Sequence, residues 1–166
     1  MKRRIAICAE DTPAAAEATR WAVNEVYREG DVFHLIYVIK SMKPPLEIHH
    51  AAPGTSFTFA QPGGHHEKEV ITAAKKAIEH RYLPILKTKM VPYELHLYAD
   101  RTDATPKHVG DLILKCTDER DAVMIVLAAH NKPTERDRWA GEVGSVAAYV
   151  MKNCKRPLAI VHPKGL

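Results

Sequence analysis

Five short apolar runs, separated by segments with helical periodicity, limit what this chain can fold into. They are Arg4–Ala9, Val32–Ile39, Tyr93–Ala99, Val123–Ala129 and Leu158–Val161. Continuous apolar runs of this length are typical of strands buried on both faces, and such strands form parallel sheets covered by helices. We therefore expect an α/β fold, a three-layer sandwich in which a five-stranded parallel sheet is packed between four helices.

Two of the expected helices share one start signal. Thr12-Pro13 and Thr105-Pro106 each place a hydroxyl at the N-cap position and a proline in the first turn. The apolar stripes that follow have a spacing of three or four residues, as a helix buried on one face requires. They are Ala18, Ala22 and Val26 in the first helix, with Gly30 as its stop, and Val109, Leu112, Ile113 and Cys116 in the second.

A long segment without periodicity separates the second strand from the next helix. Pro44-Pro45, Pro53-Gly54 and Pro62-Gly63-Gly64 punctuate it, so a loop over residues 41–65 is expected. The helix that follows runs from His66 to about Met90, and Pro84 is expected to kink or interrupt it. Since no repeat or linker divides the chain, residues 1–166 are expected to form a single domain.

Composition excludes several classes of protein. No apolar run approaches the ~20 residues that cross a bilayer, so no membrane association is expected. The net charge of +4 is spread along the chain, which argues against a nucleic-acid partner. The three cysteines are widely spaced, as is usual in a reducing compartment such as the cytoplasm.

Ligands of open parallel sheets bind beyond the carboxyl ends of the strands, where the strand order reverses. Gly144-Ser145-Val146 opens the last helix, whose N-terminus should face this crevice with N–H groups that favour an anion. The buried face of this helix is expected to contain Val146, Tyr149, Val150, Asn153 and Cys154.

Several segments resemble one known family. They are Glu10-Asp11-Thr12-Pro13, His34-Leu-Ile-Tyr-Val38, Gly144-Ser-Val-Ala-Ala-Tyr-Val150 and Cys154-Lys-Arg-Pro157-Leu-Ala-Ile-Val-His162-Pro163. Together they resemble the universal stress protein family, with its adenine-nucleotide hydrolase-like fold, over essentially the whole chain. Many members of that family bind ATP or AMP through a G-x-x-G, nine residues, G-[S/T] loop after the fourth strand.

This loop is altered here. Gly144 and Ser145 match its last pair, but Ala128-Ala129-His130-Asn131 replaces the G-x-x-G, and twelve residues separate Asn131 from Gly144. Glu10 stands where the family usually has the aspartate that meets the ribose. The resemblance therefore implies ATP or AMP as ligands of an altered pocket, and leaves open whether either binds. Its implied residues are Ala9, Glu10, Val38, Leu127, Ala128, His130, Asn131, Gly144, Ser145, Val146 and Ala147.

We expect neither catalysis nor a metal site. No nucleophile–base set can be identified, and His49-His50 and His65-His66 lack the spacing of helical metal ligands. The function expected is that of a non-catalytic, dimeric stress-response regulator, and the alternative is a functional ATP- or AMP-binding protein. The resemblance implies a homodimer formed through Leu158–Val161, and a further protein partner is left open.

Overall fold

The five strands form one parallel sheet with the order β3-β2-β1-β4-β5. The computed structural model describes residues 2–39, 64–99, 105–129 and 143–162. The strands are β1 Arg4–Cys8, β2 Val32–Ile39, β3 Tyr93–Ala99, β4 Met124–Ala128 and β5 Leu158–Val161. The sheet predicted from the apolar runs is confirmed, although β1 and β4 exclude the predicted end residues Ala9, Val123 and Ala129.

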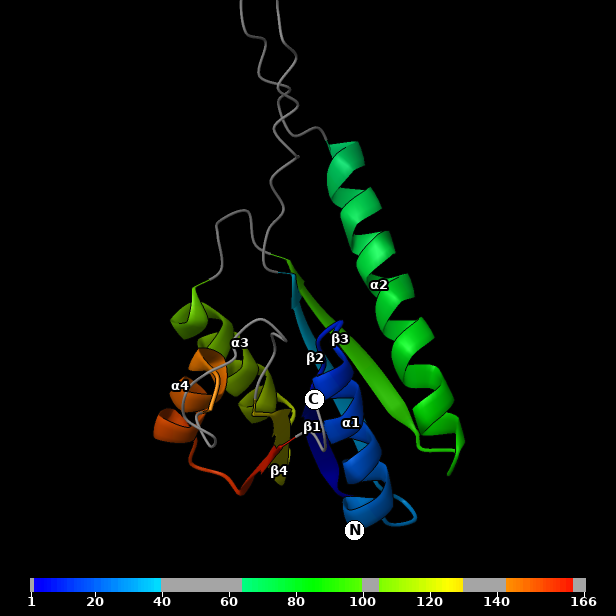
Figure 1. Ribbon diagram of the computed structural model, residues 1–166, viewed down its shortest axis with the longest axis vertical. Coiled ribbons are helices and arrows are strands. Elements are labelled where there is room, and N and C mark those ends of the chain that lie inside the picture. Colours follow the sequence, from blue (N-terminus) through cyan, green and yellow to red (C-terminus); the bar gives the residue numbers. More distant parts are fainter. Residues whose placement is uncertain (1, 40–63, 100–104, 130–142, 163–166) are drawn as a thin grey trace, which may run out of the picture.

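Helices cover both faces of the sheet (Figure 1), with α1 and α2 on one face and α3 and α4 on the other. They are α1 Pro13–Trp21, α2 Gly64–Lys87, α3 Pro106–Glu119 and α4 Ser145–Asn153. A π-helical turn, η1 (Ala22–Val26), continues α1. This arrangement is the predicted three-layer sandwich.

The pleat of β1 divides the core in two. Ile5 and Ile7 face α1 and α2, whereas Ala6 and Cys8 face α3 and α4. Tyr82, Ile78 and Leu86 of α2 fill the first half and are almost fully buried. The second half takes its bulk from α3 and α4, mainly through Val109, Ile113, Cys116 and Val150.

Both predicted N-caps are confirmed. The hydroxyl of Thr12 accepts a hydrogen bond from the Ala15 N–H at 3.2 Å, and Thr105 accepts one from the His108 N–H at 3.2 Å. Each threonine is followed by proline at the first helical position. These caps fix where α1 and α3 begin, just beyond the carboxyl ends of β1 and β3.

The first helix ends earlier than predicted. The Tyr27 N–H donates to the Ala22 carbonyl at 2.9 Å, a bond across five residues that closes the π-helical turn. Gly30 lies three residues beyond Tyr27, with φ +91, in the turn that leads into β2. Its left-handed backbone serves this turn rather than ending the helix.

Helix α2 differs from its prediction at three points. It begins at Gly64, so Gly64 and His65 belong to the helix and not to the predicted 41–65 loop. Residues 40–63 lie outside the described chain. Pro84 does not interrupt the helix. Proline has no N–H to donate to the His80 carbonyl, but Pro84 and His80 are both exposed, so water can take the place of this hydrogen bond. The helix ends at Lys87 rather than at Met90.

The predicted buried face of α4 is wrong at one position. Val150 is buried, and Val146, Tyr149 and Cys154 are half-buried. Asn153 is exposed, because it lies at the helix end and its side-chain Nδ2 donates to the Tyr149 carbonyl at 2.8 Å. The missed buried residue is Ala147.

Arginines close the amino-terminal end of the sheet. Arg3 donates from Nε to Asp31 Oδ1 at 2.9 Å, and the Arg28 N–H donates to Asp31 Oδ2 at 2.8 Å. Burial by itself raises the pKa of Asp31, but these hydrogen bonds and the Arg3 charge outweigh it and lower the pKa. Beside β4 and β5, Arg156 donates to the Ala122 carbonyl at 2.6 Å and to Asp118 at 3.0 Å.

Candidate functional site

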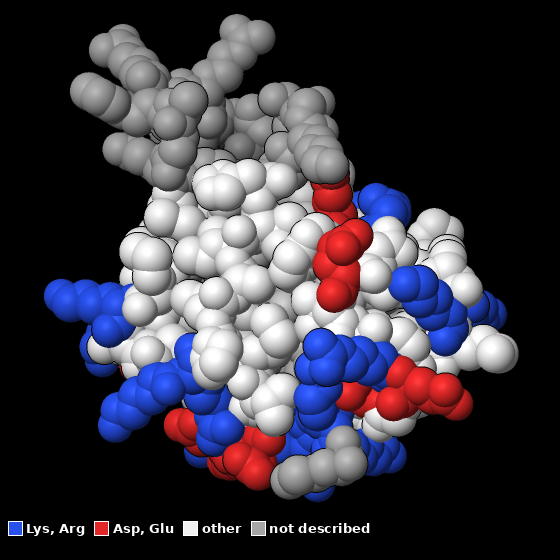
Figure 2. Space-filling model, turned by 90° about the horizontal axis from the view of Figure 1, so that it is seen from below, with Lys and Arg blue, Asp and Glu red and all other residues white. Residues whose placement is uncertain are grey.

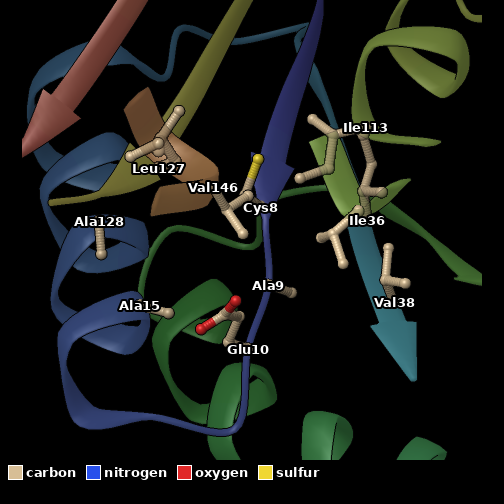
Figure 3. Close-up of a pocket in the computed structure, with 12 residues that line it drawn as sticks. Cys8, Ala9, Glu10, Ala15, Ile36, Val38, Ile113, Leu127, Ala128 and Val146 are labelled. Carbon is tan, nitrogen blue, oxygen red and sulfur yellow. The ribbon is translucent and has the colours of Figure 1, made fainter. Parts of the chain in front are cut away.

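A hollow lies at the carboxyl ends of the strands, where the sheet order reverses between β1 and β4 (Figure 3). Strands β1, β2 and β3 succeed one another toward one edge, whereas β4 pairs with the opposite side of β1. The hollow holds about 450 Å³ of space outside the atoms when solvent at its mouth is counted. Its closed part has room for about one water molecule.

The lining comes from strand ends and from three helices. Strands β1, β2 and β4 provide its floor, while α3 and α4 form one wall and α1 the other. The lining residues are Cys8, Ala9, Glu10, Ala15, Ile36, Val38, Val109, Ile113, Leu127, Ala128, Val146 and Ala147. Apolar side chains therefore surround a single carboxylate, that of Glu10, which points into the hollow in Figure 3.

Helix α2 positions the backbone of Glu10. The Tyr82 hydroxyl donates to the Glu10 carbonyl at 2.7 Å and accepts from the Glu10 N–H at 2.9 Å. Arg81 donates from Nε to the Asp11 carboxylate at 2.7 Å. Since Tyr82 is fully buried, this double hydrogen bond fixes the chain that leaves β1 at the rim of the hollow.

The N-terminus of α4 borders the hollow on the wall opposite α1. Gly144 is its N-cap, and the Gly144 N–H donates to the Ala129 carbonyl just after β4. Helical geometry leaves the N–H groups of the first turn without partners inside the helix, and Val146 and Ala147 of that turn line the hollow. This turn therefore offers N–H donors and a positive dipole end beside the hollow.

Helices α3 and α4, which form one wall of the hollow, pack closely against each other. Gly110 of α3 lies directly under the ring of Tyr149, where a β-carbon would overlap the ring. The Tyr149 hydroxyl donates to Asp111 at 2.7 Å, and this hydrogen bond lowers the pKa of the Asp111 carboxyl. The small residue at position 110 thus allows α4 to approach α3.

The lining suits binding better than bond-making chemistry. Burial raises the pKa of the Cys8 thiol far above its usual range, so the thiol is protonated and a poor nucleophile. Glu10 is the other ionisable residue of the lining. Among the residues that line this hollow, no nucleophile is paired with a base.

The structure brings together most of the residues that the sequence analysis selected. Seven of them line the hollow: Ala9, Glu10, Val38, Leu127, Ala128, Val146 and Ala147. Gly144 and Ser145 are at the start of α4, next to this lining. His130 and Asn131 lie outside the described residues.

Sequence reasoning missed five lining residues, namely Cys8, Ala15, Ile36, Val109 and Ile113. Periodicity could have found two of them. Ile36 precedes Val38 by two residues on the same face of β2, and Ile113 follows Val109 by one helical turn. Cys8 and Ala15 carry no such signal, because their place depends on how α1 folds back over β1.

On the face drawn in Figure 2, basic and acidic side chains are interspersed along the lower part and the sides of the view, and the area above them is mostly uncharged. Among the described residues, no helix is long and apolar enough to cross a membrane.

Comparison with known proteins identifies the architecture. The family model of the universal stress protein family matches residues 1–162. No individual curated protein matches the sequence. Many solved structures resemble the fold, all those described below at less than 20% identity.

The universal stress protein from Archaeoglobus fulgidus is 19% identical with a TM-score of 0.62, and the match covers 96% of this chain and 98% of that one. UspA from Lactobacillus plantarum is 19% identical with a TM-score of 0.64, covering 96% and 97%. The Archaeoglobus fulgidus universal stress protein in complex with dAMP is 18% identical with a TM-score of 0.59, covering 96% and 97%. At such identity these structures show the fold alone. The family match spans nearly the whole sequence, and the chain belongs to the universal stress protein family.

Proposed function

We propose that this chain is a non-catalytic regulatory protein of the stress response, with an altered pocket that binds ATP and AMP weakly. The observation that carries the proposal is the apolar hollow at the strand reversal, with Glu10 as its single carboxylate. A purine base suits apolar walls, and a carboxylate accepts hydrogen bonds from ribose hydroxyls. The absence of a nucleophile–base pair among the lining residues supports a binding role rather than turnover.

Two features of the hollow argue for weak binding. Its closed part has room for about one water molecule, so a purine ring can be buried there only if the surrounding side chains move. The methyl group of Ala128 lines the hollow at the end of β4, where the family pattern has a glycine. A side chain at this point keeps phosphate oxygens away from the backbone N–H groups.

The second candidate is a functional ATP- or AMP-binding protein, and the start of α4 favours it. Gly144 and Ser145 retain the end of the family's phosphate-binding pattern, and the α4 N-terminus lies beside the hollow. A relative of the same fold from Archaeoglobus fulgidus was solved with dAMP. Helix N-termini commonly bind phosphate groups.

Native mass spectrometry, with and without added ATP or AMP, separates the two candidates. We expect purified protein free of nucleotide and a dissociation constant in the millimolar range. Nucleotide retained through purification, or micromolar affinity, would overturn the proposal in favour of the second candidate. We expect the double substitution Ala128→Gly and Asn131→Gly to strengthen binding by about tenfold, and Gly144→Val added to it to remove the gain.

We also propose that the protein is a homodimer joined through β5, as the sequence resemblance implies. Strand β5 pairs with β4 along one side, and all four of its residues are half-buried although they are apolar. Beside it is a groove whose walls include Trp21, Ala159 and Ile160, and the Trp21 side chain is exposed. An apolar edge strand of this kind is suited to pairing with a second copy.

Light scattering tests the dimer. We expect a dimer mass at micromolar concentration and a monomer mass for Ile160→Lys. The matched control is Met151→Lys, which places the same charge on an exposed apolar residue of α4. A monomeric wild type, or an unchanged mass for Ile160→Lys, contradicts the proposal.

A cytoplasmic location is proposed on the ground that Cys8, Cys116 and Cys154 are all free thiols.

A further inference from the structure

Two histidines and one glutamate meet on the sheet face that α3 and α4 cover. The Nδ1 atom of His34 lies 2.9 Å from the Nε2 atom of His96. The Oε2 atom of Glu94 lies 3.6 Å from that His34 nitrogen and 3.8 Å from that His96 nitrogen. Three potential metal ligands thus surround one point in space.

The register of two strands brings these groups together. His34 of β2 is directly opposite Glu94 of β3, and His96 follows Glu94 by two residues. Residues two apart on a strand point to the same face, and directly opposed residues have side chains in contact. The sheet backbone therefore holds all three ligands in place, and no flexible loop is needed to assemble them.

Both imidazole side chains are largely buried. The side chain of His34 is 4% exposed and that of His96 is 12% exposed. Burial lowers the pKa of each histidine, and the Glu94 carboxylate acts in the opposite direction. An imidazole coordinates a metal ion through a ring nitrogen that carries no proton.

A hydrogen bond between the two imidazole rings does not account for the Glu94 carboxylate beside them. One N–H can lie between His34 Nδ1 and His96 Nε2, but the Glu94 carboxylate then remains beyond hydrogen-bonding distance of both nitrogens.

We propose that His34, His96 and Glu94 bind a divalent transition-metal ion, with Zn²⁺ as the favoured ion. Two imidazoles and one carboxylate form a common zinc ligand set. Bonds of about 2.0–2.1 Å in tetrahedral geometry place neighbouring ligand atoms roughly 3.3 Å apart. The observed separations of 2.9, 3.6 and 3.8 Å bracket this value.

The surrounding charges make Glu94 the critical ligand. Arg4 and Arg120 both act on His34, and their positive charges oppose a bound cation. The Glu94 carboxylate is the negative group that offsets them. Because it is exposed, its replacement leaves the core untouched and tests the site without unfolding the protein.

In this arrangement the ion joins the edge strand β3 to β2. The site lies on the same sheet face as the hollow, and His96 is paired in register with Ile36, which lines that hollow. Metal binding would therefore stiffen the β2 part of the floor of the hollow, independently of whether nucleotide binds.

Equilibrium dialysis of the untagged, metal-free protein against Zn²⁺ tests the proposal. Histidine pairs outside the described side chains can also bind zinc, so the difference between variants is decisive. We expect wild type to bind one more Zn²⁺ per chain than His96→Asn. Glu94→Gln should weaken this binding by at least about tenfold, the scale on which even outer-shell partners act. Zn²⁺ should raise the melting temperature of wild type more than that of either variant.

Two matched controls lie on α2, across the sheet. His80→Asn and Glu79→Gln replace the same residue types away from the cluster, and both should behave as wild type. Circular dichroism verifies that every variant is folded. Equal zinc stoichiometry and equal thermal response in wild type and His96→Asn would overturn the proposal. Unchanged affinity in folded Glu94→Gln removes the carboxylate from the site and overturns the three-ligand form.

Discussion

The two ends of the sheet are constructed in different ways. At the amino-terminal end, short turns are closed by arginines that bind carboxylates and carbonyls, as Arg3 does with Asp31 and Arg156 with Ala122. The carboxyl-terminal end carries a hollow walled by small and apolar side chains, where Tyr82 holds the chain at Glu10. Ion pairs and hydrogen bonds of arginines stabilise the amino-terminal end. The carboxyl-terminal end is open as a hollow, and Tyr82 of α2 supports it through hydrogen bonds to the main chain. The difference separates the part that stabilises the fold from the part that can bind.

The largest expected effect lies at the amino-terminal end. Arg3→Met removes the charged partner of a carboxylate that is 2% exposed, and leaving such a buried charge uncompensated costs about 3 kcal/mol of unfolding free energy. Urea unfolding measures this loss. Because the hollow is at the far end of the strands, we expect the folded variant to bind ligands as wild type does. Altered ligand binding would show that the two ends are coupled.

Acid should remove the difference between Arg3→Met and wild type. The pKa of Asp31 is lower in the folded chain than its unfolded value of about 3.9. The ion pair therefore contributes its full stability above about pH 4 and loses it as the pH falls through the folded pKa. Unfolding curves at a series of pH values should converge as the pH falls through the folded-state pKa of Asp31. A difference that persists at low pH would mean that Arg3 acts through packing rather than through charge.

A smaller effect is expected where α3 meets α4, at the carboxyl-terminal end. Gly110→Ala places a methyl group against the Tyr149 ring, and such overpacking costs about 2 kcal/mol. The displaced α4 should widen the hollow, so Cys8 should react faster with iodoacetamide, as followed by mass spectrometry. Adding Tyr149→Leu gives the methyl group space and should restore slow reaction. If Cys8 reactivity does not change in the single variant, this contact does not set the width of the hollow.

The smallest effect is expected from Tyr82→Phe. The ring still fills the core, but both hydrogen bonds to Glu10 are lost, at a cost of about 1 kcal/mol. Hydrogen exchange of the Glu10 amide should accelerate, while amides of β1 such as that of Ile7 exchange as before. Unchanged exchange at Glu10 would show that α2 does not hold this end of the chain.

The fold could be predicted from local signals, and the particular residues show why. Thr12 and Thr105 act as caps wherever α1 and α3 dock, because a cap needs only its own helix. The hollow was partly predictable because parallel strands end at one edge, which placed Glu10, Val38 and Leu127 together. Asn153 could not be placed, since periodicity gives the face of a helix but not where its burial ends.

The metal cluster was beyond sequence reasoning for a different reason. His34 lies within an apolar run, and its partners are about sixty residues away in the chain. Only the register between β2 and β3 brings the three together, and a shift of one residue turns the side chains to the opposite face. Histidines that are adjacent in sequence, such as His49-His50 and His65-His66, are the more visible candidates for metal ligands, but adjacency does not indicate which side chains meet in space.

The two hydrogen bonds from Tyr82 have a consequence for how the hollow of this protein can vary. They are made to the amide and carbonyl of residue 10, and neither involves the glutamate side chain. The anchoring of the main chain is thus independent of which side chain occupies that position. The carboxylate can therefore be exchanged for an amide or a hydroxyl, which changes the ligands that the hollow can accept, while the hydrogen bonds from Tyr82 to the main chain stay in place.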